Sequence, residues 1–227
     1  MNARLLIALT LVLGLCSAAL AADSACLFSG KNLDGWKLKG PEKSSQWKVG
    51  TAALDPANPA KIQFTPGEGE MVNAGAHGLD IYTEKKFGDG TIHVELMVPK
   101  GSNSGVYVMG EYEIQVLDSY GKEKIGPGDM GGIYAAKPAK VNASKKPGEW
   151  QEMIIEYKAP RFEDGKKTAN ARIVKITLNG QVIHEDVELK GATPGGVTGK
   201  EAAEGPLMFQ GNHGEVAYRN ISFTPAK

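Results

Sequence analysis

The feature that most constrains the fold of this chain is a strict alternation of apolar and polar residues at positions 91–98. Every second residue there is a large aliphatic one, namely Ile92, Val94, Leu96 and Val98. Successive side chains of a β-strand point to opposite sides of a sheet, so this period of two predicts a strand with one face in a hydrophobic core. Glu95 would then lie on the opposite, polar face.

Further strands are predicted along the rest of the chain. Alternating or β-branched stretches fall at residues 104–109, 111–118, 150–157, 171–178, 181–184 and 215–223. Asn179-Gly180 is a two-residue hairpin turn, and Gly110 indicates a tight hairpin or a bulge. The chain contains 29 glycines and 12 prolines, and no stretch beyond the N-terminal segment has helical periodicity. Many strands with closely spaced turns predict an all-β sandwich or barrel.

The N-terminal segment has the layout of a secretory signal peptide. Arg4 precedes an uncharged apolar run at residues 5–15, and Ala19-Leu20-Ala21 places small residues where a signal peptidase cleaves. The run is too short to span a membrane comfortably, because a span takes about 20 apolar residues. We therefore expect a signal peptide at residues 1–21 and a single domain at residues 22–227. That domain would be periplasmic or secreted, with no membrane span after cleavage.

Composition excludes several other classes of function. The 26 Lys and Arg residues balance the 26 Asp and Glu residues, so no basic excess indicates a nucleic acid partner. Cys26 is the only cysteine after the predicted cleavage point, which excludes an intrachain disulfide and a multi-cysteine metal site. A Gly-x-Ser-x-Gly motif, a phosphate-binding glycine loop and a dinucleotide fingerprint are all absent. The sequence leaves the oligomeric state open.

Polar residues gather on the predicted outer faces of two strands. Glu113 and Gln115 share one face of the strand at residues 111–118, and Glu95 lies on a strand only a short connection away. If the two strands pair, these side chains form one patch that suits sugar hydroxyls, because carboxylates and amides can each bond two of them. For any single residue, a solvated outer face is the simpler interpretation. The small residues at 101–105 would let a ligand approach the backbone closely.

His213 is the most attractive candidate base. It lies in Gln210-Gly-Asn-His-Gly214, a glycine-flanked loop before the last predicted strand, although a loop histidine can simply bond a backbone carbonyl. No pair of histidines has the spacing of a zinc site, whereas a divalent cation held by carboxylates stays open. Trp36, Trp47 and Trp150 are interpreted as packing residues rather than as platforms for sugar rings.

Several ordered motifs resemble those of the 3-keto-disaccharide hydrolase domain family. They are Leu27-Phe-Ser-Gly-Lys-Asn-Leu-Asp-Gly-Trp36, Asn103-Ser-Gly-Val-Tyr107, Tyr112-Glu-Ile-Gln-Val-Leu-Asp118, Gly132-Ile-Tyr134, Gly148-Glu-Trp-Gln151, Leu178-Asn-Gly180, Gln210-Gly-Asn-His-Gly214 and Arg219-Asn-Ile221. The first resembles the opening strand of the family, and the resemblance covers nearly all of the predicted mature chain. It implies a concanavalin A-like jelly-roll β-sandwich of two antiparallel sheets. It also implies export and action on glycosides whose sugar is oxidised at C3.

By motif position, the resemblance implies a set of pocket residues. They are Glu95, Asn103, Glu113, Gln115, Asp118, Gln210, His213 and Arg219, and Tyr107 of the Asn103 motif joins them as a candidate for substrate binding. Within this set, His213, Glu95 and Glu113 are the candidate catalytic residues, and the others are candidates for binding the sugar. Many family members have an arginine shortly after the Asn-Ser-Gly stretch, where this chain has Met109, Gly110 and Glu111, so its specificity could differ.

A ketone at C3 would acidify the neighbouring proton at C2. A base that removes this proton gives an enolate, which expels the C1 substituent, and water then adds across the new double bond. We expect His213 or Glu95 to be the base, with Arg219, Gln115 or a carboxylate-held cation stabilising the enolate. Arg219 could instead only pair with a carboxylate. Two alternatives are direct hydrolysis of an unoxidised sugar by two carboxylates such as Glu95 and Glu113, and a carbohydrate-binding module without catalysis.

Overall fold

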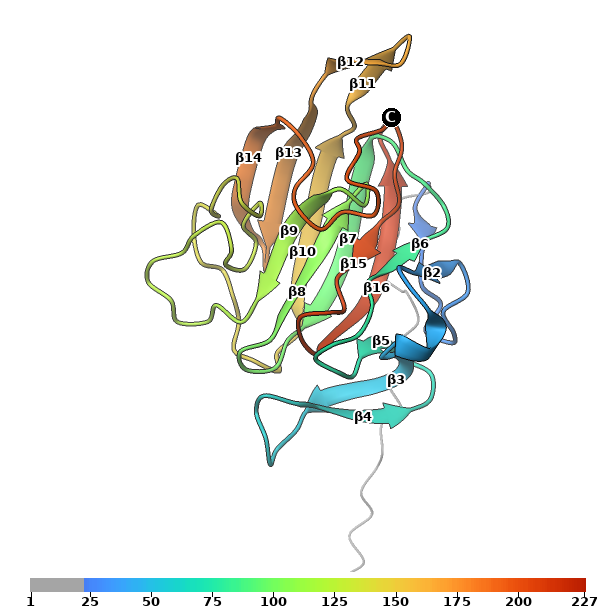
Figure 1. The fold of residues 1–227 in the computed structure, drawn as a ribbon. Helices are drawn as coiled ribbons and strands as arrows, with labels where there is room; N and C mark the ends of the chain where they lie inside the picture. Colours follow the sequence, from blue (N-terminus) through green and yellow to red (C-terminus); the bar gives the residue numbers. More distant parts are fainter. Residues whose placement is uncertain (1–22) are drawn as a thin grey trace, which may run out of the picture.

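Two antiparallel β-sheets face each other across a hydrophobic core in the computed structural model, which describes residues 23–227 (Figure 1). The expected two-layer β-sandwich is therefore confirmed. The predicted signal peptide at residues 1–21 lies outside the described residues. Between residues 23 and 227 the only helix is one 3₁₀ turn, Glu42–Ser44. No helix in this part of the chain is long and apolar enough to cross a membrane.

The larger sheet has nine strands in the order β14-β13-β10-β7-β16-β5-β3-β4, with β1 beside β16. Their bounds are β1 Ala25–Cys26, β3 Trp47–Leu54, β4 Ile62–Pro66, β5 Glu70–Asn73, β7 Gly90–Met97, β10 Gln151–Lys158, β13 Ala171–Leu178, β14 Gln181–Leu189 and β16 Val216–Pro225. Strands β7 and β16 pair near the middle of this sheet, although more than 100 residues separate them in the chain. The sheet is therefore built largely from contacts between distant segments.

The smaller sheet has five strands in the order β2-β6-β15-β8-β9. Their bounds are β2 Trp36–Leu38, β6 Ile81–Thr83, β8 Asn103–Val108, β9 Tyr112–Leu117 and β15 Met208–Phe209. Residues 131–134 extend this sheet by running along the free edge of β9 with backbone hydrogen bonds of 2.8–3.0 Å. Strands β11, Arg161–Glu163, and β12, Lys166–Ala169, form a separate hairpin that projects from the larger sheet (Figure 1).

The core between the sheets consists of the residues that the alternation assigned to it. Val94 and Leu96 of β7 and Val106 and Ile114 of the smaller sheet are completely buried in one cluster. Full burial of an aliphatic side chain of this size contributes about 1.5–3 kcal/mol to folding. Their neighbours in sequence must therefore point outward from each sheet, and this places the polar residues of β7 and β9 on the outer faces.

Most predicted strands are confirmed to within two residues, and β14 runs further than expected, to Leu189. The prediction of an opening strand at residues 27–36 is wrong. This segment is irregular, and only Trp36 enters a strand, β2. Its indole Nε1 donates to Leu27 O at 2.9 Å, so the segment closes on itself instead of pairing. A glycine-rich stretch with Gly30 and Gly35 at positive φ favours such turns.

A second, smaller apolar cluster lies on the outer face of the larger sheet. It contains Ile62 of β4, Val72 of β5, Met97 of β7 and Ala217 of β16, with Trp150 packed against it. Alternation places Met97 on the same, polar face of β7 as Glu95, but Met97 is only 1% exposed. The outer face of the larger sheet is therefore partly covered, and polar residues beside this cluster are not simply solvated.

Candidate functional site

The two strands that carry the predicted polar patch belong to different sheets. β7 pairs with β10 and β16 in the larger sheet, whereas β8 and β9 pair in the smaller one. The expectation that Glu95, Glu113 and Gln115 form one patch is therefore wrong. Alternation shows which residues point away from the core, but the chain changes sheet between β7 and β8. Glu95 and Glu113 consequently face away from each other across a sandwich whose layers are about 10 Å apart.

Polar side chains converge on the outer face of the smaller sheet. Glu113 and Gln115 of β9 lie opposite Tyr107 and Gly105 of β8, and Gln210 follows β15 beside them. We call this surface the small-sheet face, and its polar members are Asp80, Asn103, Tyr107, Glu113, Gln115 and Gln210. Most of these side chains are buried even though they point away from the core, with exposures of 1% for Tyr107 and 3% for Glu113. A buried polar cluster outside the core is typical of a ligand site.

Glu113 is the most perturbed acid on the small-sheet face. Its carboxylate lies over Gly105, where a Cβ atom would come within 2.5 Å of Glu113 Oε1, so only glycine leaves room for it. No Lys, Arg or His of residues 23–227 forms an ion pair with it. Burial raises the pKa of Glu113 to about 7, the nearby Tyr107 hydroxyl opposes the rise, and the charge of Asp80 adds to it. A carboxyl group with this pKa can both accept and donate a proton near neutral pH.

Tyr107 and Gln210 line the site beside Glu113. The Tyr107 hydroxyl donates to Pro194 O at 3.1 Å and accepts from Gln210 Nε2 at 3.4 Å. Burial, together with the nearby charge of Glu113, raises the pKa of Tyr107, so its hydroxyl stays protonated and can act as a donor. Gln210 Oε1 is buried and has no hydrogen-bond partner among the described residues. An unpaired buried acceptor is costly, and a ligand hydroxyl could satisfy it.

Asp80 and Lys39 complete the charged part of the site, and the sequence analysis missed both. Asp80 Oδ1 accepts from Gly211 N at 3.1 Å, and its other oxygen lies 3.5 Å from Lys39 Nζ. Lys39 also donates to Gly195 O and Gly196 O at 2.8 Å each. The only sequence pattern that could have indicated Asp80 is the short alternation around β6, in which Asp80 points outward and the next residue, Ile81, is buried. Three residues of strand are too few to predict a face from.

Residues 193–199 cover part of the small-sheet face. The Thr193 hydroxyl accepts from Glu113 N at 2.8 Å, and Glu111 accepts from the backbone N–H groups of Thr198 and Gly199 at 2.8 and 2.9 Å. Gly195 lies so close to Tyr107 that a Cβ there would be 2.6 Å from its hydroxyl. The sequence predicted only a loop in this region. The loop is tied to both β8 and β9, and it excludes water from one side of the site.

Three other predicted residues lie at the far end of β8 and β9. Gln115 Nε2 donates to Asn103 Oδ1 at 2.6 Å and to Ser104 O at 3.1 Å, so these two amides form one linked unit on the small-sheet face. Asp118 accepts from Gly101 N at 2.9 Å. Asp118 therefore stabilises the turn before β8, and its carboxylate is at the margin of the face.

His213 lies at the rim of the site and is exposed. Residues 210–214 follow β8 closely: Gln210 N donates to Gly105 O at 3.0 Å, and a Cβ on Gly214 would lie 2.8 Å from Asn103 N. His213 Nδ1 contacts Asn212 Oδ1 and makes no other hydrogen bond within residues 23–227. The histidine therefore lies in a loop that runs beside Asn103, and the exposed side chain of Asn212 is its one hydrogen-bond partner among the described residues.

Glu95 and Arg219 form a separate polar cluster on the outer face of the larger sheet. Arg219 Nε donates to Glu95 Oε2 and Asn220 Nδ2 donates to Glu95 Oε1, both at 2.7 Å. A bulge in β16 after Arg219, with φ of 50° at Asn220, lets two consecutive residues reach one carboxylate. Arg219 also stacks on the Trp150 ring, with Cζ 4.0 Å from its centroid. These contacts satisfy Glu95 and Arg219 within the protein, and neither residue belongs to the small-sheet face.

The pKa of Glu95 moves in the opposite direction to that of Glu113. Burial would raise it, but the hydrogen bonds from Asn220 and Arg219 and the charge of Arg219 outweigh burial and lower it. Within residues 23–227, no group of three His, Cys, Asp or Glu side chains is arranged to hold a metal ion. The described residues therefore offer an acid–base site on the smaller sheet and a structural ion pair on the larger one.

Comparison with known proteins supports a carbohydrate-related assignment. The model of the 3-keto-alpha-glucoside-1,2-lyase-like domain family matches residues 23–224. The chain is similar to a protein of known structure from Parabacteroides distasonis that is provisionally named a glycosyl hydrolase. The two superpose with a TM-score of 0.70 at 29% identity, covering 90% of this chain and 84% of that one.

A second protein from the same organism, with the same provisional name, superposes with a TM-score of 0.63 at 19% identity, covering 90% of this chain and 94% of that chain. At that identity the similarity concerns the fold alone. A search of curated protein sequences finds no significant match.

Proposed function

The chain belongs to the 3-keto-alpha-glucoside-1,2-lyase-like domain family, and on this premise we propose that it cleaves 3-keto-glycosides at the small-sheet face. The family and the similar structure make it a carbohydrate-active protein, either an enzyme or a binder. The proposal goes further by naming the substrate class, the reaction and the residues that carry it out.

The observation that carries this proposal is the state of Glu113. A base for the C2 proton of a 3-keto sugar must be unpaired, shielded from water and close to neutral in pKa. Glu113 is 3% exposed, forms no ion pair with the described residues, and has a pKa raised by burial to about 7. Glu95, one of the two bases that the sequence suggested, is held by Arg219 and Asn220 and has a lowered pKa. We therefore assign the base to Glu113.

The chemistry proceeds in two balanced steps. In the first, the Glu113 carboxylate takes the C2 proton, the C2–H electron pair forms an enolate with the C3 carbonyl, and the Tyr107 hydroxyl turns from Pro194 O to donate its hydrogen bond to the enolate oxygen. Protonated Glu113 gives this proton to the C1 oxygen substituent as the enolate expels it, so the substituent leaves as an alcohol and a C1=C2 double bond conjugated with the ketone remains. Gln210 Oε1 accepts a hydrogen bond from a sugar hydroxyl, which satisfies its unpaired acceptor.

In the second step, water adds across the C1=C2 bond, with its oxygen at C1 and a proton at C2. The Glu113 carboxylate, free again after the first step, takes a proton from the attacking water and delivers it to C2, so the proton at C2 of the product comes from solvent. If both steps occur on the protein, the net reaction is hydrolysis; if the unsaturated ketone leaves first, the protein is a lyase. The covering residues 193–199 would favour retention of the intermediate, because they shield Tyr107 and Glu113 from solvent.

Direct hydrolysis of an unoxidised sugar is the competing reaction. Glu95 and Glu113 cannot perform it together, because they lie on opposite outer faces of the sandwich. Asp80 is the one other carboxylate whose charge reaches Glu113, but it is occupied by Lys39 and by Gly211 N. A carboxylate pair for this route would need both groups free on either side of the bond. The geometry therefore favours proton removal beside a ketone.

The decisive experiment compares a 3-keto-glucoside with the parent glucoside, with and without a chelator, in D₂O. We expect cleavage of the keto sugar alone, with deuterium at C2 of the product. Cleavage of the parent glucoside without exchange at C2 would replace the elimination by direct hydrolysis. Binding of either sugar without any product would make the protein a carbohydrate-binding module. Time-resolved ultraviolet absorbance of the conjugated ketone would separate a lyase from a hydrolase.

We also propose that the protein is exported, on the basis of the signal-peptide layout at residues 1–21. N-terminal sequencing of the protein from the periplasm or the medium is expected to begin at Ala22. A protein retained in the cytoplasm with its first residues intact would contradict the proposal.

A further inference from the structure

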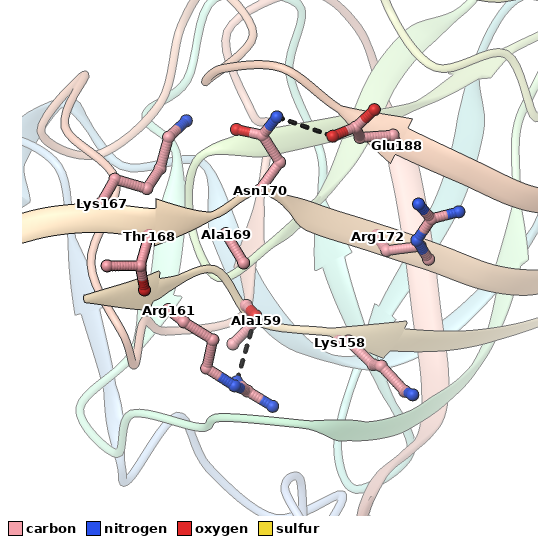
Figure 2. A pocket seen from close by; sticks show the side chains of 9 residues that line it. All are labelled: Lys158, Ala159, Arg161, Lys167, Thr168, Ala169, Asn170, Arg172 and Glu188. Atoms are coloured by element: carbon pink, nitrogen blue, oxygen red, sulfur yellow. Dashed lines mark hydrogen bonds between the residues drawn. The ribbon is translucent and has the colours of Figure 1, made fainter. Parts of the chain in front are cut away.

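A polar hollow of about 670 Å³ lies where the β11–β12 hairpin leaves the larger sheet, outside the small-sheet face. Its lining includes four basic side chains, Lys158, Arg161, Lys167 and Arg172, and one acid, Glu188. Figure 2 shows Lys158 and Arg172 on neighbouring strands, with their charged ends directed to the same side of the view. We call this feature the basic hollow. None of the residues discussed for the reaction lines it.

The basic hollow contains two basic side chains in directly opposed positions of the sheet. Lys158 of β10 is directly opposite Arg172 of β13, and no acidic residue lies between them in the sheet. Like charges in directly opposed positions of a sheet repel each other and destabilise it. Glu188 is opposite Arg172 on the other side, but its carboxylate accepts from Asn170 Nδ2 at 2.8 Å. The row therefore reads base, base, acid.

The neighbouring row on the same strands has the complementary arrangement. Glu156 of β10 is opposite Lys175 of β13, which is opposite Glu185 of β14. Lys175 Nζ lies 2.6 Å from Glu156 Oε1. This row reads acid, base, acid, as expected for a stable outer face. The Lys158–Arg172 pair therefore stabilises the sheet less than the neighbouring row does.

Several donors in the basic hollow are available to a ligand. Lys158 has no ion pair or side-chain hydrogen bond within residues 23–227, although its charge, after the hydrogen bond from Arg161, helps to lower the pKa of Asp89. Arg172 uses only Nη1, in its contact with Asp186, whose side chain is 81% exposed, so Nε and Nη2 have no acceptor in that part of the chain. Arg161 is different, because Asp89 binds both of its terminal nitrogens, at 2.8 and 2.5 Å. Lys167 is also engaged, because its Nζ lies 2.6 Å from Glu201 Oε2. The free donors are thus concentrated at the Lys158–Arg172 pair.

We propose that the basic hollow is a second saccharide site, which binds an acidic sugar through its carboxylate. A carboxylate between Lys158 and Arg172 would relieve their repulsion and form charge-assisted hydrogen bonds with both. Thr168 and Asn170, which also line the hollow, add a hydroxyl and an amide for sugar hydroxyls. The volume is that of a small-molecule site rather than of a single ion. The site would hold an acidic glycan beside the domain without taking part in the reaction.

The test is calorimetric titration of the purified protein with a galacturonic acid trimer, a neutral glucose trimer and inorganic sulfate, at low and at physiological salt. We expect the acidic trimer to bind, and its affinity to fall as salt rises. Arg172→Gln and Lys158→Gln should each weaken binding about tenfold, and the double variant should abolish it. Lys175→Gln is the matched control, because it removes one positive charge from the same strand and face. It should change the affinity less than twofold.

Amide chemical shifts of the unmodified protein give a readout that does not depend on the stability of a variant. The acidic trimer should move the signals of Thr168 and Asn170, and it should do so equally in Glu113→Gln, which separates this site from the small-sheet face. Three outcomes would overturn the proposal: equal affinity for the neutral trimer, equal affinity for sulfate, or a loss of binding in Lys175→Gln as large as in Arg172→Gln.

Discussion

Glu113 and Glu95 occupy equivalent positions in the two sheets and have opposite electrostatic states. Each is an acid within a strand, at a position that alternation directs away from the core. Glu95 accepts hydrogen bonds from Arg219 and Asn220 at 2.7 Å, and its pKa is lowered. Glu113 has no cation beside it, and burial raises its pKa to about 7. The larger sheet therefore stabilises the charged form of Glu95, whereas the smaller sheet leaves Glu113 able to gain or lose a proton near neutral pH.

The difference arises because distant parts of the chain contribute different groups to the two outer faces. On the larger sheet, a bulge in β16 supplies both donors to Glu95, and Trp150 supports the arginine. On the smaller sheet, Gly105 removes a side chain below Glu113, and residues 193–199 cover it without supplying a positive charge. A satisfied carboxylate contributes to stability, and an unsatisfied buried one is kept at the expense of stability. This contrast predicts opposite responses to mutation.

The largest expected effect is the loss of turnover in Glu113→Gln. Removal of a general base typically lowers the rate by 10²–10⁴-fold, and we expect kcat on a 3-keto-glucoside to fall by at least ~10²-fold with little change in KM. Glu95→Gln is the matched control, because it makes the same chemical change at the equivalent position of the other sheet. Its kcat should stay within about threefold of the original, since Glu95 is not at the small-sheet face. A larger loss of kcat in Glu95→Gln than in Glu113→Gln would contradict the assignment of the base to Glu113.

The second prediction concerns stability at different pH. The pKa of Glu113 is raised from 4.5 to about 7, so the folded protein holds more protons than the unfolded chain between these values. Stability attributable to this group therefore falls as pH rises from about 4.5 to 7. Glu113→Gln should be more stable than the original at pH 8 by roughly 1–3 kcal/mol, and equally stable at pH 4. Urea unfolding at the two pH values measures this.

The same titration also sharpens the contrast with Glu95. Its pKa is lowered, so Glu95 contributes stability above its ordinary pKa, and that contribution is lost as pH falls. Glu95→Gln should therefore destabilise the protein at pH 8, by about 1–2 kcal/mol for the charged hydrogen bonds lost. A single trend shared by both variants would show that the two carboxylates are not in different states.

Turnover should follow the ionisation of Glu113. The carboxylate form is the base, so kcat/KM should rise about tenfold per pH unit below the pKa and level off above about pH 7. Phe substituted for Tyr107 removes the hydroxyl that opposes the raised pKa, so the midpoint should move to higher pH. An unchanged midpoint in Tyr107→Phe would show that the Tyr107 hydroxyl does not act on the pKa of Glu113, whatever the effect of the substitution on the rate.

The sequence predicted the sandwich and the outward direction of Glu95, Glu113 and Gln115 because alternation reports on a single strand. It did not predict which sheet each strand joins, since β7 and β8 are linked by a short turn whether they pair or change sheets. The bulge at Asn220 and the cover provided by residues 193–199 also depend on contacts between distant segments. Those contacts decide which carboxylate is neutralised. Motif position alone therefore ranked Glu95 and Arg219 with the residues of the small-sheet face.

The smallest expected effect is that of His213→Ala, although the loop motif first suggested this residue as the base. His213 is exposed, contacts only Asn212 among the described side chains, and lies at the rim beside Asn103. Asn212 is itself exposed, so the His213 ring is not shielded from water as the Glu113 carboxylate is. We expect kcat to fall less than about fivefold and the melting temperature to stay unchanged, in kinetics and thermal unfolding of the same preparation. A loss of turnover comparable to that of Glu113→Gln, with sugar binding retained, would instead make His213 the proton donor to the leaving alcohol. The reaction would then be shared between the covered centre of the face and its exposed rim.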